Sequence, residues 1–222
     1  MIATSFDLPP FARPPAARSS RLLADRRARG VEAVVVVNGA VTIAIWVLHG
    51  GFRTLQSPGG MLTGAGQVTG LVGTYAVLVE LLLMSRIAWL ERSIGLDRLA
   101  VWHRWTGFAA LTFLTLHVVF ITAGYAAADR RSLVQELWDF IQHYPDVLMS
   151  VVGFGLFVAV AVTSVREARK RLNRETWHLV HLYAYLAVAL SFAHQLAVGT
   201  DFSNDARARV WWSALYVAVF GA

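Results

Sequence analysis

Hydrophobic positions along the chain gather into six long runs, and most polar positions fall in the segments between them. The apolar runs cover residues 31–52, 63–85, 99–127, 147–165, 177–199 and 210–222. Most of them reach the ~20 residues that a helix needs to cross the hydrocarbon core of a bilayer. Only backbone that is hydrogen-bonded within its own segment is stable there, so each run predicts a transmembrane helix. The pattern therefore predicts an all-α integral membrane protein, a bundle of six transmembrane helices.

The sixth run is shorter than the others. It covers only residues 210–222, and at ~1.5 Å per residue such a helix does not cross a bilayer. The sequence also stops inside this run, without a closing charged residue. We therefore expect a truncated sixth helix in a fragment of a longer chain, whose further part begins on the cytoplasmic side. The alternative is a complete subunit in which the sixth helix spans half of the bilayer.

The segment LVQELWDFIQHYPDV, residues 133–147, has a different character from the six runs. Its apolar residues recur with the period of an amphipathic helix. Such a helix is expected to lie on the membrane surface rather than to cross it.

The basic residues lie at the ends of the apolar runs and orient the bundle. Six arginines fall within residues 1–30, and further basic clusters lie at 86–98 and 166–174. By the positive-inside rule these three segments are cytoplasmic, which predicts a multi-pass cell-membrane protein with a cytoplasmic N-terminus. We divide the chain into a basic cytoplasmic tail, 1–30, and a membrane domain, 31–222. The net charge of +6 belongs to this topogenic pattern and does not indicate nucleic-acid binding.

The overall composition supports the membrane location and removes several kinds of redox site. Hydrophobic residues make up 56% of the chain, charged residues 15%, and the mean hydropathy is +0.52. A soluble domain of this size is less apolar. Because cysteine is absent, disulfides, thiolate-bound iron–sulfur clusters and the C-x-x-C-H haem attachment are excluded.

Two of the predicted transmembrane helices carry histidines, which are costly in lipid and usually face the interior of a bundle. The third helix holds His103 and His117, fourteen residues apart, and the fifth holds His181 and His194, thirteen apart. Fourteen residues are ~21 Å of helix and nearly four turns, so the first two rings share a face. Both helices start from the cytoplasm, so the depths pair His103 with His181 and His117 with His194.

Two facing pairs of imidazoles at different depths suit two six-coordinate haems, one in each leaflet. Haem iron with both axial positions filled by histidine favours electron transfer. Any one of these histidines is explained about as well by a hydrogen bond between helices, and only the matched depths favour ligation. A zinc site needs three or four ligands around one ion, which pairs ~20 Å apart do not provide.

The spacing on the fifth helix does not fit an ideal helix. Thirteen residues rotate the second ring ~140° away from the first. We expect this helix to be overwound or kinked, or the haems to be tilted. His178 would not share a face of the helix with His194 either, and it lies at the aqueous edge. We therefore keep His181 as the predicted ligand.

The motifs around these histidines are similar to those of a known family. H-R-W-T-G-F at His103 with a second histidine fourteen residues on, and W-H-L-V-H-L-Y at His181 with a later His194, resemble the ferric reductase-like transmembrane domain. This domain is shared by NADPH oxidases, ferric reductases and bacterial flavocytochromes. The resemblance implies that the four positions ligate an inner and an outer haem b. It further implies electron flow from NAD(P)H through FAD and both haems to an acceptor outside.

The sequence contains no G-x-G-x-x-G nucleotide motif, so FAD and NAD(P)H would bind a missing domain or a partner reductase on the cytoplasmic face. The chain would then be an oxidoreductase component that carries only the haem relay. The alternative is a stand-alone haem subunit that delivers electrons to a separate periplasmic reductase. Oxidases of the family carry another histidine one turn beyond the outer ligand, where this chain has Ile121, so superoxide production is not expected.

Several other residues lie near the predicted haems. For Glu80 we favour snorkelling to the cytoplasmic edge or pairing with an arginine there, with tuning of the inner haem or a hydrogen bond near it as the alternative. Gly66, Gly70 and Gly73 predict close helix packing on the second helix, with admission of a flat macrocycle as the alternative. Three further residues flank the inner pair, namely Arg104, Trp105 and Trp177. We favour interfacial anchoring as their role, with contact to the inner haem as the alternative. We interpret His49 and His143 as surface residues on the outer side, with contact to the electron acceptor as the alternative.

Overall fold

The computed structural model describes residues 15–203 and 205–222, and all regular elements within them are helices. The helices are α1 (Pro15–Leu48), α2 (Gly51–Thr54), α3 (Gly60–Met84), α4 (Ala88–Ile94), α5 (Leu96–Asp129), α6 (Leu133–His143), α7 (Val147–Ser164), α8 (Arg166–Arg169), α9 (Arg174–Val198), α10 (Thr200–Ser203) and α11 (Ala206–Phe220). Five of them are long and apolar enough to cross a membrane, namely α1, α3, α5, α7 and α9. The prediction of an all-α, multi-pass membrane protein is confirmed.

The sixth predicted helix is α11, which has 15 residues. It begins four residues before the predicted run, at Ala206, and Asp205 caps it by accepting a hydrogen bond from the backbone N–H of Arg207 at 2.7 Å. The amphipathic segment forms α6 as predicted. A capping box starts α6, in which Ser132 and Gln135 satisfy each other's backbone N–H groups.

The first helix begins earlier than predicted. We placed its start at Val31 behind a basic tail, whereas the structure continues the helix back to Pro15. Proline is favourable at a first helical position, and the sequence that follows is rich in alanine, leucine and arginine, which are strong helix formers. Asp25 also pairs with Arg98 at 3.0 Å, which holds this part of α1 against the start of α5. The first fourteen residues of the predicted tail lie outside the described residues.

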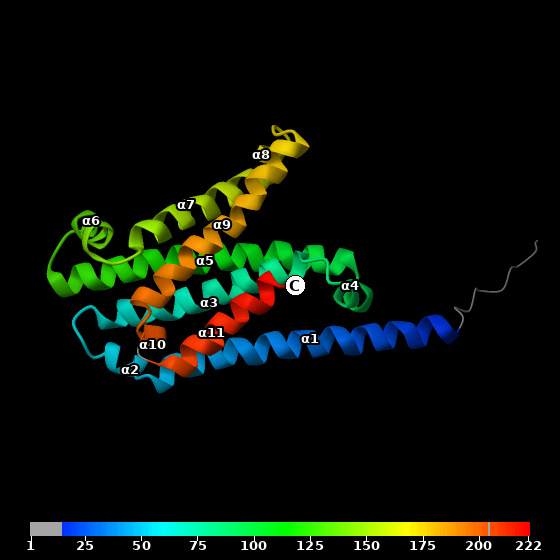
Figure 1. Cartoon of the computed structure of the whole chain (residues 1–222), viewed down its shortest axis with the longest axis horizontal. Coiled ribbons are helices and arrows are strands. Elements are labelled where there is room, and N and C mark those ends of the chain that lie inside the picture. Colours follow the sequence, from blue (N-terminus) through cyan, green and yellow to red (C-terminus); the bar gives the residue numbers. More distant parts are fainter. Residues whose placement is uncertain (1–14, 204) are drawn as a thin grey trace, which may run out of the picture.

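Two antiparallel helix pairs form the body of the bundle (Figure 1). In one pair α3 packs along α5, and in the other α7 packs along α9. The close approach of α3 and α5 depends on small residues, as predicted. A Cβ added at Gly66 would lie 2.7 Å from the side chain of Ile121, and one at Gly73 would lie 3.0 Å from that of Leu114. Helices α1 and α11 pack against α3.

The two pairs meet differently from the helices within each pair. Helix α9 runs obliquely to α5, and within the described residues these two helices have little or no close backbone contact. The space between them is therefore left to side chains. Large apolar side chains such as those of Val36, Trp105 and Leu179 are exposed on the outside, which suits contact with lipid.

The short helices divide between the two ends of the bundle. Helices α4 and α8 lie at the end where α1 begins, while α2, α6 and α10 lie at the other (Figure 1). The basic segments 86–98 and 166–174 therefore share the α4/α8 end, as the positive-inside pattern requires.

Candidate functional site

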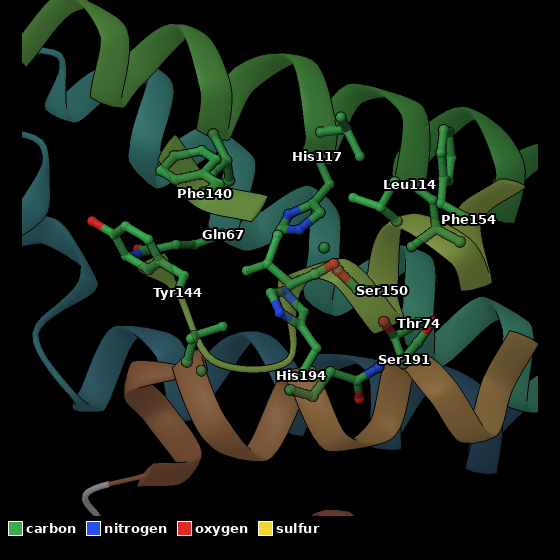
Figure 2. A pocket seen from close by; sticks show the side chains of 18 of the residues that line it. Gln67, Thr74, Leu114, His117, Phe140, Tyr144, Ser150, Phe154, Ser191 and His194 are labelled. Atoms are coloured by element: carbon green, nitrogen blue, oxygen red, sulfur yellow. Dashed lines mark hydrogen bonds between the residues drawn. The ribbon is translucent and has the colours of Figure 1, made fainter. Parts of the chain in front are cut away.

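One candidate site is a cavity of about 430 Å³ between α3, α5, α7 and α9. His117 from α5 and His194 from α9 both line it, and Figure 2 shows their rings pointing toward each other. The structure therefore brings together the pair that we predicted at the outer level. The remaining wall is mostly apolar, with residues such as Leu114 and Phe154, and Phe140 and Tyr144 close it toward the α6 end.

The backbone of α3 orients the His117 ring. Nδ1 of His117 lies 2.8 Å from the carbonyl oxygen of Gly66, so Nδ1 carries the proton and donates to it. Nε2 then keeps its lone pair, which is the arrangement that a metal-ligating histidine requires. Gly70 provides the room for the ring, because a Cβ there would lie 2.5 Å from Nδ1 of His117.

His194 completes the outer pair from the opposite wall. Its Nδ1 is buried and has no hydrogen-bond partner among the described residues. A buried imidazole nitrogen without a partner is costly in protein alone. A cofactor metal would bond one nitrogen of the His194 ring, and an ordered water would hydrogen-bond the other. The residues present therefore fit a metal-centred group between His117 and His194.

The inner pair also comes together. The ring centres of His103 and His181 are 6.0 Å apart, with the ring planes at 63°. Bonds from imidazole nitrogen to a metal are about 2 Å long, so two rings on opposite sides of one metal have centres roughly 6 Å apart. His103 and His181 are therefore the two residues that would hold a metal-centred group at the inner level.

Different neighbours surround the two inner histidines. Nδ1 of His103 contacts a carboxylate oxygen of Glu80. The His181 ring stacks on Trp177 at 4.8 Å, and the Arg169 guanidinium lies 4.2 Å from the centre of the Trp177 ring on α9. The hydroxyl of Ser164 lies 3.5 Å from Nδ1 of His181.

Our favoured interpretation of Glu80 was wrong. Its contact is with His103, and no arginine forms an ion pair with it among the described residues. The antiparallel packing of α3 on α5 is the reason, because it brings Glu80 against Gly107 and His103. A Cβ at Gly107 would lie only 2.9 Å from a carboxylate oxygen of Glu80.

Three predicted neighbours of the inner haem divide into two groups. Trp177 stacks on His181, whereas Arg104 and Trp105 contact each other, with the guanidinium 5.8 Å from the indole centre. Trp105 is also 64% exposed, as expected for an interfacial anchor. His178 is exposed at the start of α9, in keeping with our preference for His181.

The thirteen-residue spacing on α9 does not keep its two histidines from their predicted partners. Helix α9 is continuous from Arg174 to Val198 and runs obliquely to α5 (Figure 1). His181 lies against His103, and His194 faces His117 across the cavity.

A cluster of charged residues lies at the α2/α10 end of the bundle. His49 Nε2 lies 3.0 Å from Asp205, and His49 Nδ1 lies 3.4 Å from Asp201. Burial raises the pKa of Asp201, an effect that His49 opposes. The backbone N–H of Arg207, and then His49, lower the pKa of Asp205. Our interpretation of His49 as a simple surface residue missed these contacts, which join α1 to the α10–α11 connection.

His143, the other outer histidine, pairs within its own helix, where its Nδ1 lies 3.2 Å from Asp139. Among the described residues, no group of three or more histidine, aspartate or glutamate side chains is arranged to hold a single metal ion.

Some contributors to the site had no clear signal in the sequence. The Gly66 carbonyl that orients His117 is backbone, and nothing in residue type marks it. Gln67 and Gln195 line the cavity, and Gln195 accepts hydrogen bonds from Trp212 and Tyr216 at 2.8 Å each. An amide in an apolar run was a signal that could have pointed to them.

Comparison with known protein families supports the resemblance seen in the motifs. Residues 69–192 match the family described as the ferric reductase like transmembrane component, which is more than half of the chain. The chain belongs to this family. The match includes His103, His117 and His181, and His194 lies two residues beyond its end. No solved structure matches the chain.

Two curated relatives are similar to the membrane region. One is the protein-methionine-sulfoxide reductase heme-binding subunit MsrQ of Caulobacter vibrioides, 28% identical over 58% of this chain and 58% of its own length. The other is the magnetosome protein MamZ of Paramagnetospirillum magneticum, 27% identical over 45% of this chain and 15% of its own length. The alignments thus span less than two thirds of either relative.

Proposed function

We propose that this family member relays electrons across the membrane through two b-type haems. His103 and His181 would hold the inner haem, and His117 and His194 the outer one. The observation that supports this most strongly is the pairing of four histidines at two levels across the space between α5 and α9. Interhelical contacts with Gly66, Ser164 and Glu80 occupy single rings, but they do not explain why the four rings face each other in two pairs.

A haem with two histidine ligands supplies reversible one-electron chemistry at iron. The residues of the chain contribute orientation and environment. The Gly66 carbonyl keeps the proton of His117 on Nδ1, and the apolar wall around Leu114 and Phe154 excludes water. At the inner level, Trp177 packs on His181 and limits the rotation of its ring.

We assign the α4/α8 end to the cytoplasm because the basic segments gather there. Electrons would enter at this end from an FAD- and NAD(P)H-binding domain or partner reductase and leave at the α2/α6/α10 end. The acceptor outside would be a ferric chelate, oxygen or another oxidant. Ile121 lies in the cavity wall where oxidases of the family carry a histidine, so a ferric or other acceptor is preferred over oxygen.

The second candidate is a stand-alone haem subunit that delivers electrons to a separate reductase outside the membrane. The similarity to the Caulobacter protein, which is named as the heme-binding subunit of a methionine-sulfoxide reductase, favours this candidate. Both candidates use the same haem relay and differ in the donor and acceptor. Purification of the tagged full-length protein from its native membrane separates them. A flavin domain that is covalently joined or co-purified from the cytoplasmic side supports the first, and co-purification of a reductase from outside the membrane supports the second.

The test of the shared core of both candidates is the haem content of the purified protein. We expect two haems b per chain by pyridine haemochrome analysis, with low-spin spectra in both redox states. A folded protein that remains colourless after expression with ample haem would refute the relay.

A further inference from the structure

The two histidine pairs differ in what their second ring nitrogens meet. At the outer level, His117 donates to a neutral backbone carbonyl, and Nδ1 of His194 has no partner among the described residues. At the inner level, His181 faces the neutral hydroxyl of Ser164, whereas His103 faces the carboxylate of Glu80. Among the described residues, Glu80 is therefore the acidic side chain that contacts one of the four histidine rings.

Glu80 lies where an acid is not expected without a specific role. It is only 9% exposed, one turn before the end of α3 and between α3 and α5, and it contacts His103. Burial of a carboxyl group is costly, and the contact with the His103 imidazole offsets part of that cost. Gly107, on the face of α5 toward Glu80, leaves space for the carboxylate beside the ring. The space at Gly107 thus allows the Glu80 carboxyl group to lie against the His103 ring.

A carboxylate that accepts the Nδ1 proton of a ligating histidine makes Nε2 a stronger electron donor. A stronger donor and a nearby negative charge both favour ferric over ferrous iron, which lowers the reduction potential. A backbone carbonyl, the partner of His117, has this effect to a smaller degree because it carries no net charge. Among the described residues, a carboxylate is in direct contact with a histidine ring of the inner pair and not with one of the outer pair.

We infer that Glu80 is a positioning residue that lowers the reduction potential of the inner haem below that of the outer haem. This inference rests on the proposed function. The one electron that leaves the inner site reduces the outer site, and no proton or bond is exchanged between them. The difference in potential makes this transfer favourable from the α4/α8 end toward the α2/α6/α10 end.

The test is redox titration of both haems in the full chain, with Glu80→Gln as the main variant. Glutamine keeps the shape and an acceptor oxygen but removes the charge. We expect the preference of the inner haem for the ferric state to fall at least tenfold, which raises its reduction potential by about 59 mV for a one-electron couple. The reduction potential of the outer haem should stay unchanged. A His194→Ala background, which retains the inner haem alone, assigns the component that moves.

Two controls separate a local effect from a general one. Glu32→Gln removes the same charge from an exposed position on α1 and should leave both potentials unchanged. Glu80→Asp retains the charge and should keep the inner potential closer to wild type than Glu80→Gln does. The electron paramagnetic resonance g values of the ferric inner haem should shift in Glu80→Gln and not in Glu32→Gln.

The possible outcomes are distinguishable from failure of the proposed function. A wild-type protein without haem refutes the relay itself. If wild type binds two haems and the reduction potential of the inner one is equal to or higher than that of the outer one, the proposed role of Glu80 is wrong. This outcome is decisive even if Glu80→Gln does not fold. An inner potential that is the same in Glu80→Gln and wild type also overturns it.

Discussion

At the scale of single residues, the outer site depends on an absent side chain. Gly70 lies beside the imidazole of His117, and any Cβ there would meet the ring. Nδ1 of the same ring also lies 2.8 Å from the Gly66 carbonyl oxygen. The position of His117 is therefore determined by two glycines on the neighbouring helix, one through its carbonyl and one through its lack of a side chain.

Gly70→Ala should therefore disturb the outer site selectively. We expect His117 to be displaced and the affinity for the outer haem to fall at least tenfold, within the range seen when partners of metal ligands are altered. Haem content and the visible spectrum of the purified variant provide the measurement. Gly155→Ala on α7 is the matched control, because a Cβ there meets nothing within 4 Å. Equal haem content in both variants would contradict this account.

Replacement of the histidines tests the assignment of ligands. We expect His103→Ala or His181→Ala to remove the inner haem, and His117→Ala or His194→Ala to remove the outer one, each leaving one haem per chain. His178→Ala should retain both, because His178 is exposed and outside the two pairs. Haemochrome analysis measures the outcome. Loss of a haem in His178→Ala, with both retained in His181→Ala, would show that the ligand on α9 was chosen wrongly.

The four histidines were visible in the sequence because a polar ring in an apolar run is a strong contrast. The partner of Glu80 was not, because it depends on how α3 is rotated against α5, and that rotation is determined by the packing of Gly73 and Gly107. Periodicity gives the face of one helix and does not give the register between two helices. Backbone partners such as the Gly66 carbonyl are invisible to residue type altogether.

At the scale of elements, apolar runs predicted the helices well and their ends less well. Helix α3 was predicted at 63–85 and is found at Gly60–Met84, whereas α1 starts at Pro15 rather than Val31. The difference at α1 arises because a charged but helix-prone sequence continues the helix beyond the apolar run. The oblique course of α9 was also beyond reach of the sequence, since a crossing angle depends on both packing surfaces.

The start of α6 offers a test at this scale. Ser132 accepts a hydrogen bond from the Gln135 N–H at 3.3 Å, and the Gln135 side chain accepts one from the Ser132 N–H at 3.0 Å. Ser132→Ala should cost about 1 kcal/mol of local stability, seen as roughly fivefold faster amide hydrogen exchange in the first turn of α6. Ser132→Asn keeps a capping side chain and should exchange nearly as slowly as wild type. Unchanged exchange in Ser132→Ala would mean that packing alone holds α6.

At the scale of the whole molecule, charge is distributed unevenly along the bundle. The α4/α8 end carries exposed arginines, including Arg86 and Arg92, and suits an acidic docking surface of the electron donor. Attraction of this kind extends about 10 Å in 0.1 M salt and about 3 Å in 1 M salt. Electron entry should therefore depend on ionic strength.

The purified chain should be reduced by dithionite but not by NAD(P)H, and addition of a cognate flavin domain or reductase should restore reduction by NAD(P)H. Stopped-flow haem absorbance should show a rate that falls with added salt. Arg86→Gln with Arg92→Gln should slow it severalfold, whereas Arg53→Gln at the opposite end should not. Rapid reduction of the chain alone by NAD(P)H, or a rate insensitive to salt, would contradict this division of roles.

The sparse packing between α5 and α9 has a consequence for the life of the protein in the cell. Each helix is well packed within its own antiparallel pair, but the two pairs have few backbone contacts where the histidines face each other. A group bound by both helices would add a second joint to the apolar core through which α3, α5, α9 and α11 already join the two halves. A ligand at a thousand times its dissociation constant adds about 4 kcal/mol of stability, a large part of what a typical domain has. Membrane quality-control proteases would accordingly remove the chain in cells starved of haem, so its abundance would follow the cellular haem supply.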